Sequence, residues 1–303
     1  MKLYAATIED TFAEAFRMWA ARVLVTATSE RWVKTAIHEA CGYGTSVIGC
    51  DAEAGCEHMV TDADTPDGRP GAWLLMFAFK PDPLGEAMIG RVGQALMTCP
   101  TTAVYDGLPD VDEDNDDQRR LPLGDKLRYF GDGFQKSKVL DGRRYWRIPV
   151  MDGEFVVEES VGAVKAIAGG NFLVGGPDVA TALTAAEAAV EAIAPLPEVI
   201  TPFPGGIVRS GSKVGSQYDA LFASTNDAHC PTLRSATESH LPDDVQAVYE
   251  IVINGLSESA IRVAMRRGID AAAKAGATSI SAGNYGGDLG KFHFPLHEIM
   301  ETA

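Results

Sequence analysis

The residue with the clearest chemical potential is Glu250, which lies in the apolar segment VYEIVING (248–255). In a strand, Glu250 would share one face with Val248, Val252 and Asn254, while the other face is also apolar. Such surroundings desolvate a carboxyl group, which raises its pKa and keeps it protonated near neutrality. A protonated carboxyl can donate a hydrogen bond to a carbonyl oxygen that gains charge. Glu250 is therefore a candidate acid for acyl or carbonyl chemistry.

The sequence leaves a second interpretation of Glu250 open, namely a structural ion pair with a basic neighbour. The matching strand of the first half, AWLLMFAF (72–79), carries no acid, so the fold itself does not require a carboxyl group there. Asn254 would lie about 13 Å further along an extended strand, too far to reach the same reacting atom.

Two glycine-rich segments in the second half are candidate binding loops. TPFPGGIVRSGSKVGS (201–216) can bring backbone N–H groups, Arg209 and Lys213 close to an anion, although a purely structural turn remains an alternative. It lacks the G-K-[ST] ending of a P-loop. SAGNYGGDLGKF (281–292) lacks the glycine order and the strand–helix context of a dinucleotide site, so a Rossmann fold is rejected.

Cysteine and histidine offer weaker candidates. Cys230 lies beside His229 and could be a covalent nucleophile, but neighbours in an extended segment point apart. The spacing of Cys50, Cys56 and His58 matches no compact zinc pattern, so no metal site is expected.

Composition restricts the class of protein. The 303 residues are 46% hydrophobic, enough for two lobes with their own cores, and no run is long enough for a membrane span. The net charge of −16 opposes nucleic-acid binding. The start of the chain lacks a signal peptide and the five scattered cysteines predict reduced thiols, so a cytoplasmic protein is expected.

These residues must be positioned by four strand–helix–strand units, two in each half. Two such units per half predict an α/β protein, an α+β sandwich made of two ferredoxin-like lobes of similar topology. The turn-rich stretch 131–155 places the lobe boundary near residue 148, which gives lobes 1–148 and 149–303. The predicted elements are strand 22–27, helix 29–41 and strand 44–49; strand 73–79, helix 84–97 and strand 101–106; strand 171–176, helix 178–194 and strand 198–203; and strand 249–254, helix 257–276 and strand 278–283.

The acidic run DVDEDNDD (110–117) is expected to be a solvated loop, because its like charges repel and it has no periodicity. A metal site is the alternative, but the run lacks the alternating ligands and glycine of a calcium loop.

Linear motifs carry the interpretation further. Over nearly its full length the chain resembles the formylmethanofuran:tetrahydromethanopterin formyltransferases. The matching segments include IEDTFAEAF (8–16), TTAVYDGLPD (101–110), YFGDGF (129–134), VITPFPGGIV (199–208), SGSKVG (210–215), ASTN (223–226), YEIVINGL (249–256) and SAGNYGG (281–287).

The resemblance implies a reversible transfer of a formyl group between methanofuran, or an analogue, and N5 of tetrahydromethanopterin. It implies a direct transfer between the two carriers as co-substrates, with no prosthetic group or metal. It also implies two similar lobes, a homo-oligomer with the active cleft near a subunit contact, and Glu250 as the key acid. Carrier-binding residues are expected in or beside these motifs: Arg209, Ser210, Lys213, Asn226, Asn284 and Tyr285.

The stretch 112–122 is longer and more acidic than in archaeal members, which favours a bacterial member. Bacterial relatives serve formaldehyde oxidation, in which companion subunits hydrolyse formyl-methanofuran to formate, so we expect that direction and such a complex. Two alternatives remain: a non-catalytic carrier-binding subunit of a formyltransferase/hydrolase complex, and a covalent acyltransferase that uses Cys230.

The hypothesis for the mechanism is that protonated Glu250 stabilises the oxyanion of a tetrahedral intermediate and assists proton movement between the two nitrogens. Arg209 and Lys213 would bind the anionic tails of the carriers.

Overall fold

A computed structural model describes residues 1–301. The chain divides into two compact units. The first unit spans residues 18–166, and the second combines residues 1–17 with the chain from Ile167 onward. Two long strands, β3 (Phe12–Thr26) and β11 (Ser160–Gly176), each contribute residues to both units.

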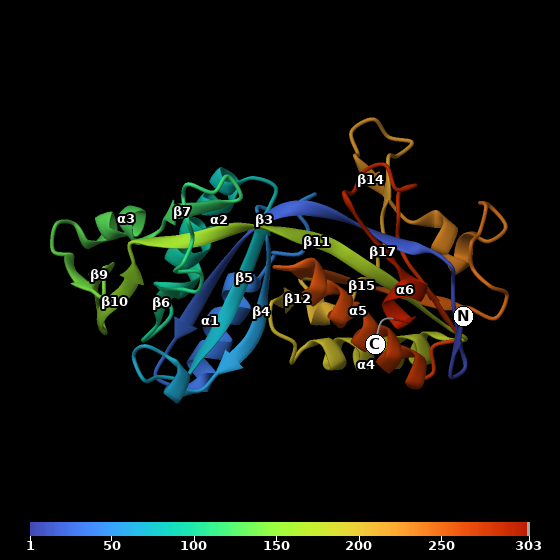
Figure 1. Ribbon diagram of the computed structural model, residues 1–303, viewed down its shortest axis with the longest axis horizontal. Coiled ribbons are helices and arrows are strands. Elements are labelled where there is room, and N and C mark those ends of the chain that lie inside the picture. Colours follow the sequence, from blue (N-terminus) through green and yellow to red (C-terminus); the bar gives the residue numbers. More distant parts are fainter. Residues whose placement is uncertain (302–303) are drawn as a thin grey trace. The chain divides into compact units, whose positions relative to one another are not determined.

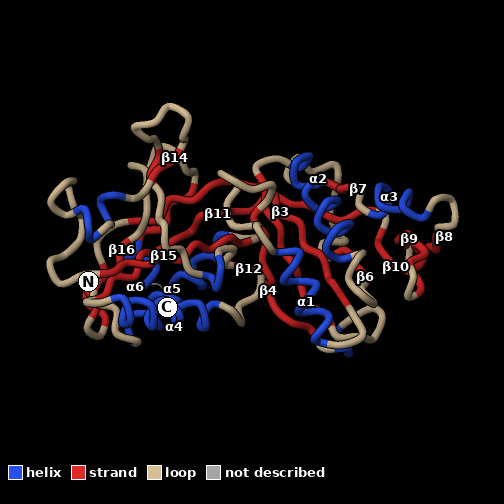
Figure 2. Tube along the Cα trace, turned by 180° about the vertical axis from the view of Figure 1, so that it is seen from behind, coloured by secondary structure: helices blue, strands red, loops and turns tan. Residues whose placement is uncertain are grey.

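The first unit is built on two strand–helix–strand repeats. Its four-stranded sheet has the order β4–β5–β3–β6, with antiparallel neighbours throughout, which is the ferredoxin-like arrangement. Both helices pack on one face of this sheet (Figure 2). Besides β3, the repeats comprise α1 (Glu30–Cys41), β4 (Glu53–Val60), β5 (Gly71–Ala78), α2 (Pro81–Arg91) and β6 (Ala103–Asp106).

Further strands extend this sheet beyond β6. β10 adds parallel to β6, β9 and β8 follow in antiparallel order, and β7 pairs with the first residues of β11. These elements are β7 (Gln118–Pro122), α3 (Gly124–Leu127), β8 (Lys136–Leu140), β9 (Arg143–Val150) and β10 (Gly153–Glu158).

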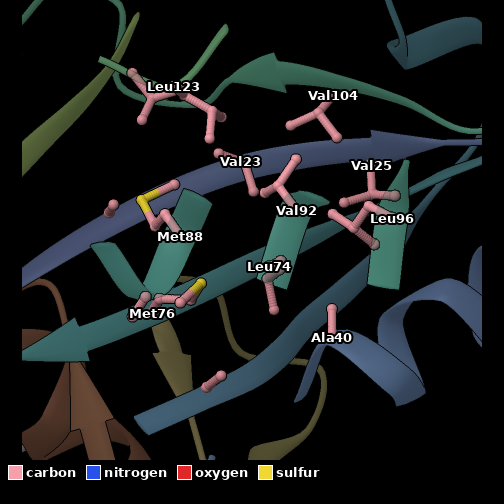
Figure 3. Close-up of a cluster of buried hydrophobic side chains, with 14 of the residues drawn as sticks. Val23, Val25, Ala40, Leu74, Met76, Met88, Val92, Leu96, Val104 and Leu123 are labelled. Atoms are coloured by element: carbon pink, nitrogen blue, oxygen red, sulfur yellow. The ribbon is translucent and has the colours of Figure 1, made fainter. Parts of the chain in front are cut away.

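The core of the first unit follows the alternation of its strands. Val23 and Val25 of β3 and Leu74 and Met76 of β5 are all buried and point to the helix-covered face (Figure 3). Met88 of α2 packs against these side chains from the helix layer. Period-two alternation in the strands and an apolar stripe on each helix therefore make one core.

The second unit repeats the same plan. Its sheet has the order β12–β15–β11–β16, again antiparallel between neighbours, and β2 adds parallel to β16 at the edge. Figure 1 shows α4 and α5 on one side of β11 and β15, with the β13–β14 hairpin on the other. The elements are β1 (Lys2–Leu3), β2 (Ala6–Ile8), α4 (Val179–Ile193), β12 (Val199–Ile200), β13 (Lys213–Val214), β14 (Ala223–Ser224), β15 (Ala247–Gly255), α5 (Glu258–Lys274), β16 (Ser279–Ser281), β17 (Phe292–Pro295) and α6 (Leu296–Glu301).

Short turns complete the chain: the 3₁₀ segments η1 (Asp62–Asp64), η3 (Arg128–Gly131), η4 (Pro204–Gly206), η5 (Asp227–His229) and η6 (Pro231–Leu233), and a π-helical turn η2 (Val92–Leu96). The helix predicted at 84–97 is therefore α-helical only to Arg91, and η2 completes it.

Capping explains where the two helices of the second unit begin. The Asp178 side chain accepts a hydrogen bond from the Thr181 backbone N–H at 2.8 Å, and Ser257 accepts one from the Ala260 N–H at 3.2 Å. Each bond satisfies an N–H group that the first turn of a helix leaves unpaired.

The predicted fold of two ferredoxin-like lobes is confirmed, but one predicted strand is wrong. Residues 44–49 form turns and bends, in which Ile48 is 67% exposed, and Tyr43 just before them has a left-handed φ of 62°. The second strand of this repeat is β4, which pairs with β5 over most of its length. The strand predicted at 198–203 is also shorter, because β12 stops before Pro202, which has no N–H to donate.

The compact units also differ from the predicted lobes 1–148 and 149–303. Residues 1–17 belong with the second unit because β2 pairs with β16 and the start of β3 pairs with β17. Residues 149–166 belong with the first unit, where β10 and the start of β11 complete its sheet.

Candidate active site

Strand β15 carries Glu250 on the sheet face that α4 and α5 do not cover. Ile251 and Ile253 point into the core beneath the helices, so Glu250 points the opposite way and is half-buried. Its backbone pairs with Leu173 of β11 on one side and exchanges two hydrogen bonds with Val208 on the other, at 2.8 and 3.0 Å. The backbone of Glu250 is therefore fixed from both sides.

Burial alone raises the pKa of Glu250 from its usual value of 4.5 to about 7. Among residues 1–301 no basic side chain forms an ion pair with this carboxyl group, so the structural ion pair is not present. Near neutral pH the group is thus poised between its protonated and ionised forms, as a general acid requires.

Tyr285 lies close enough to Glu250 for the two groups to interact electrostatically. Burial raises the pKa of the Tyr285 phenol, and the charges of Glu250 and Glu14 raise it further, whereas a hydrogen bond with Ser212 lowers it. The phenol therefore keeps its proton at neutral pH and can donate a hydrogen bond. Ser212, which sequence reasoning did not select, comes from the glycine-rich segment 201–216.

The segment 283–290, called here the Tyr285 loop, is organised around Glu14 of β3. The Glu14 side chain is fully buried, and its carboxylate accepts hydrogen bonds from the backbone N–H groups of Tyr285 at 2.7 Å, Gly287 at 2.9 Å, Leu289 at 2.6 Å and Gly290. These backbone donors lower the pKa of Glu14 despite its burial. The sequence showed Glu14 only as part of a matching motif, and nothing in its spacing indicated this role.

Two asparagines tie the same loop to the sheet. Asn171 of β11 accepts a hydrogen bond from the Gly283 N–H at 2.6 Å and donates one to the Gly283 carbonyl at 3.1 Å. The Asn284 amide donates to Thr11 Oγ1 at 3.2 Å and to the Phe12 carbonyl at 3.1 Å. Asn284, which the motifs predicted to bind substrate, therefore anchors the loop through its side chain.

The other predicted binding residues lie on the segment that contains the β13–β14 hairpin. Arg209 and Ser210 are exposed, and Arg209 forms no ion pair within the described part of the chain. Lys213 forms an ion pair with Asp227 at 2.8 Å. Asn226 contacts the His229 ring at 3.2 Å. Arg209 is thus the cation of this segment that remains available to an anion.

Cys230 is not arranged as an activated nucleophile. Its thiol donates to the Asn226 carbonyl at 3.2 Å and contacts Thr225 Oγ1 at 3.5 Å. The His229 ring instead lies edge-on to His240, at 5.6 Å between centroids. Burial and the nearby His240 lower the pKa of His229.

A small hollow lies beside Glu250 on the same open sheet face. Leu173, the neighbour of Glu250, forms part of its floor, and the Glu9 carboxylate accepts a hydrogen bond from Ser281 at 2.6 Å. Its lining also includes Gly175, His229, His240, Leu241, Pro242, Val245, Val248 and Ser279.

Within residues 1–301 no group of three or more histidine, cysteine, aspartate or glutamate side chains is arranged to hold a metal ion. No helix in this range is long and apolar enough to span a membrane.

Comparison with known proteins identifies the family. Residues 1–150 match the family model described as formylmethanofuran-tetrahydromethanopterin formyltransferase, and residues 153–299 match the model of its proximal lobe. The chain belongs to this formyltransferase family.

Relatives of similar length bear the family name. The formyltransferase of Methylobacillus flagellatus is 53% identical, over 99% of this chain and 100% of its own length. That of Methanosarcina mazei is 50% identical, with the same coverage. Bacterial and archaeal members are thus about equally similar to this chain.

Solved structures of the family have the same fold. The formyltransferase of Methanosarcina barkeri superposes with a TM-score of 0.93 at 49% identity, covering 99% of this chain and 100% of that one. A chain of the formyltransferase/hydrolase complex of Methylorubrum extorquens, solved with methylofuran, superposes with a TM-score of 0.94 at 45% identity, covering 100% of this chain and 99% of that one.

Proposed function

We propose that this protein is a formyltransferase that moves a formyl group between the amine nitrogen of methanofuran, or an analogue, and N5 of tetrahydromethanopterin. Membership of the family supports the reaction. The observation that carries the mechanism is Glu250, a carboxyl group that forms no ion pair within the described residues and whose pKa burial raises to about 7. A carboxyl group with that pKa can donate a hydrogen bond at neutral pH and can also exchange its proton.

The reaction is a direct transfer between two nitrogens. The attacking nitrogen forms a bond to the formyl carbon, and the carbonyl electron pair moves onto the oxygen. Protonated Glu250 donates a hydrogen bond to that oxyanion. The bond to the leaving nitrogen then breaks, the carbonyl re-forms, and the proton of the attacking nitrogen passes to the leaving nitrogen with the help of Glu250. The atoms and charges balance without a prosthetic group or metal.

Binding of the carriers supplies the orientation of the reacting atoms. Arg209 is exposed and forms no ion pair within residues 1–301, so it is the candidate for an anionic carrier tail. Lys213 reaches an anion only if its ion pair with Asp227 opens. Ser210 and Asn226 lie on the same segment and are candidates for further polar contacts with a carrier.

We further propose that the protein works in the cytoplasm as a homo-oligomer with companion hydrolase subunits, in the direction of formaldehyde oxidation. The support is the superposition on a chain of the Methylorubrum extorquens formyltransferase/hydrolase complex. Mixing this chain with candidate hydrolase subunits and measuring the mass of the assembly tests this part.

The decisive experiment measures transfer by the purified chain alone with formyl-methanofuran and tetrahydromethanopterin, in both directions. Turnover supports the enzyme and excludes a purely carrier-binding subunit, whereas binding of both carriers without turnover would favour that alternative. Cys230→Ala is the matched test of a covalent route, and full activity is expected because the Cys230 thiol donates to a backbone carbonyl.

A further inference from the structure

The Tyr285 loop has no helix or strand between Ala282 and Lys291, yet one side chain holds it at four points. Glu14 Oε2 receives the N–H groups of Tyr285 and Gly287, and Oε1 receives those of Leu289 and Gly290. Gly286 and Gly287 have φ values of 82° and 85°, which turn the chain so that N–H groups on both sides of Gly286 point toward Glu14. The N–H of Gly286 itself donates to Asn284 Oδ1 at 3.3 Å. The glycines thus build an anion-binding concavity, and the anion in it is a side chain of the protein.

The position of Tyr285 follows from this concavity. Its own N–H is one of the four donors, so the residue cannot move without loosening its hydrogen bond to Glu14. Phe16, two residues along β3 from Glu14, contacts the Tyr285 ring with 6.1 Å between centroids. The ring and the backbone of Tyr285 are therefore both fixed from β3.

The charge of Glu250 acts on the fixed Tyr285 phenol, which also forms a hydrogen bond with Ser212. Two neutral O–H donors can share a single oxyanion when both reach it, as paired donors do in acyl-transfer enzymes. A donor of this kind is effective only when it is already in place before charge develops, so its support matters as much as its chemistry.

We propose that Tyr285 is a second catalytic residue beside Glu250, and that Glu14 is the positioning residue that holds it there. This inference rests on the proposed function. Tyr285 would donate a hydrogen bond to the oxygen of the formyl group as the tetrahedral intermediate forms, and no bond to Tyr285 is made or broken. Glu14 touches neither carrier and acts through the loop backbone.

The test is a double-mutant cycle on kcat for formyl transfer. Tyr285→Phe removes the hydroxyl and keeps the ring, and should lower kcat about 10- to 100-fold with little change in KM. Glu14→Gln replaces a carboxylate by one acceptor oxygen and an NH₂ group that faces N–H donors, and should lower kcat to a similar extent. Because both act through the same phenol, the double variant should be within about twofold of Tyr285→Phe.

A matched control is Asp106→Asn in the first unit. Asp106 is also buried. Its carboxylate accepts hydrogen bonds from the backbone N–H groups of Leu108 and Gly162, both at 2.9 Å, and forms an ion pair with Arg120. The Asn variant should lose stability but keep kcat within about twofold of the unmodified protein, measured well below its unfolding temperature. This control separates loss of a buried carboxylate from loss of the positioned tyrosine.

Two results would overturn the inference: a kcat within about twofold of the unmodified protein for Tyr285→Phe, or a double variant whose loss equals the product of the two single losses. If Glu14→Gln does not fold, Glu14→Asp, which keeps the charge but withdraws it from the loop, completes the cycle. Full activity of Tyr285→Phe with an inactive Glu250→Gln would refute only this inference. No transfer by the unmodified chain would refute the proposed function instead.

Discussion

Replacing Glu250 with glutamine is expected to stabilise the protein at alkaline pH and to leave its stability nearly unchanged at acidic pH. Burial raises the pKa of this carboxyl group from 4.5 to about 7, so the folded protein holds a proton that the unfolded chain releases. Stability therefore falls as the pH rises from 4.5 to about 7 and is constant above that range. Glutamine has the same shape and never ionises, so the variant escapes this loss.

The size of the effect follows from the same shift. One pKa unit corresponds to about 1.4 kcal/mol, so the rise from 4.5 to about 7 corresponds to at most about 3.5 kcal/mol. The difference in unfolding free energy between Glu250→Gln and the unmodified protein should be near zero at pH 4.5, grow through pH 6, and level off above pH 7.

Urea unfolding followed by far-UV circular dichroism at several pH values measures this difference, because all four tryptophans lie in the first unit and would not report on the second. Glu187→Gln, at an exposed position of α4, is the matched control and should show no comparable trend. A stability gain for Glu250→Gln that does not depend on pH, or a variant that is less stable at pH 8, would refute the reasoning.

Three further predictions concern binding and stability. Arg209→Ala should raise KM for a carrier with an anionic tail several-fold while kcat changes little, because the exposed guanidinium contributes to binding only. Steady-state kinetics at two salt concentrations would check this, and an unchanged KM would contradict it. Asp178→Ala should lower the unfolding free energy, because the Thr181 N–H at the start of α4 loses its acceptor. Thermal unfolding would show this loss, and an unchanged melting temperature would exclude a stabilising cap. Gly268→Ala should destabilise the second unit by about 1–3 kcal/mol, because the new Cβ would lie 2.7 Å from the Phe172 ring. An unchanged free energy of urea unfolding would show that the Phe172 ring moves aside without cost.

Helices and the general topology were predictable because their signals are local. The helix predicted at 257–276 agrees with α5 within two residues at each end. The four strand–helix–strand units likewise gave the number of lobes and their ferredoxin-like order.

Strand register depended on contacts that the local sequence does not contain. GTSVIG (44–49) has the β-branched composition of a strand, yet it is a turn. EAGCEHMV (53–60) has a weaker pattern, but β5 provides a pairing edge for it and Ala54 reaches the core. The assignment of residues 1–17 to the second unit is equally non-local, since it follows from pairing with strands near the other end of the chain.

The candidate site was predictable at Glu250 because an acid within an apolar strand is a visible conflict between residue type and surroundings. Glu14 produced no such signal. Its partners are backbone N–H groups more than 270 residues away, and a backbone donor leaves no trace in residue types. The Asn284 side chain likewise donates to the backbone carbonyl of Phe12, far away in the sequence. Lys213 instead pairs with the Asp227 carboxylate, a contact that depends on how the segment folds.

The central claim is that the protonated form of Glu250 drives formyl transfer. It is tested most directly by kcat of the purified chain between pH 5.5 and 9, for the unmodified protein and for Glu250→Gln. We expect kcat of the unmodified protein to fall above a pH of about 7, where Glu250 loses its proton. Glutamine should lower kcat at neutral pH about 100-fold or more and leave a nearly flat pH profile. An unchanged kcat in Glu250→Gln, or the same decline above neutral pH in both proteins, would contradict it.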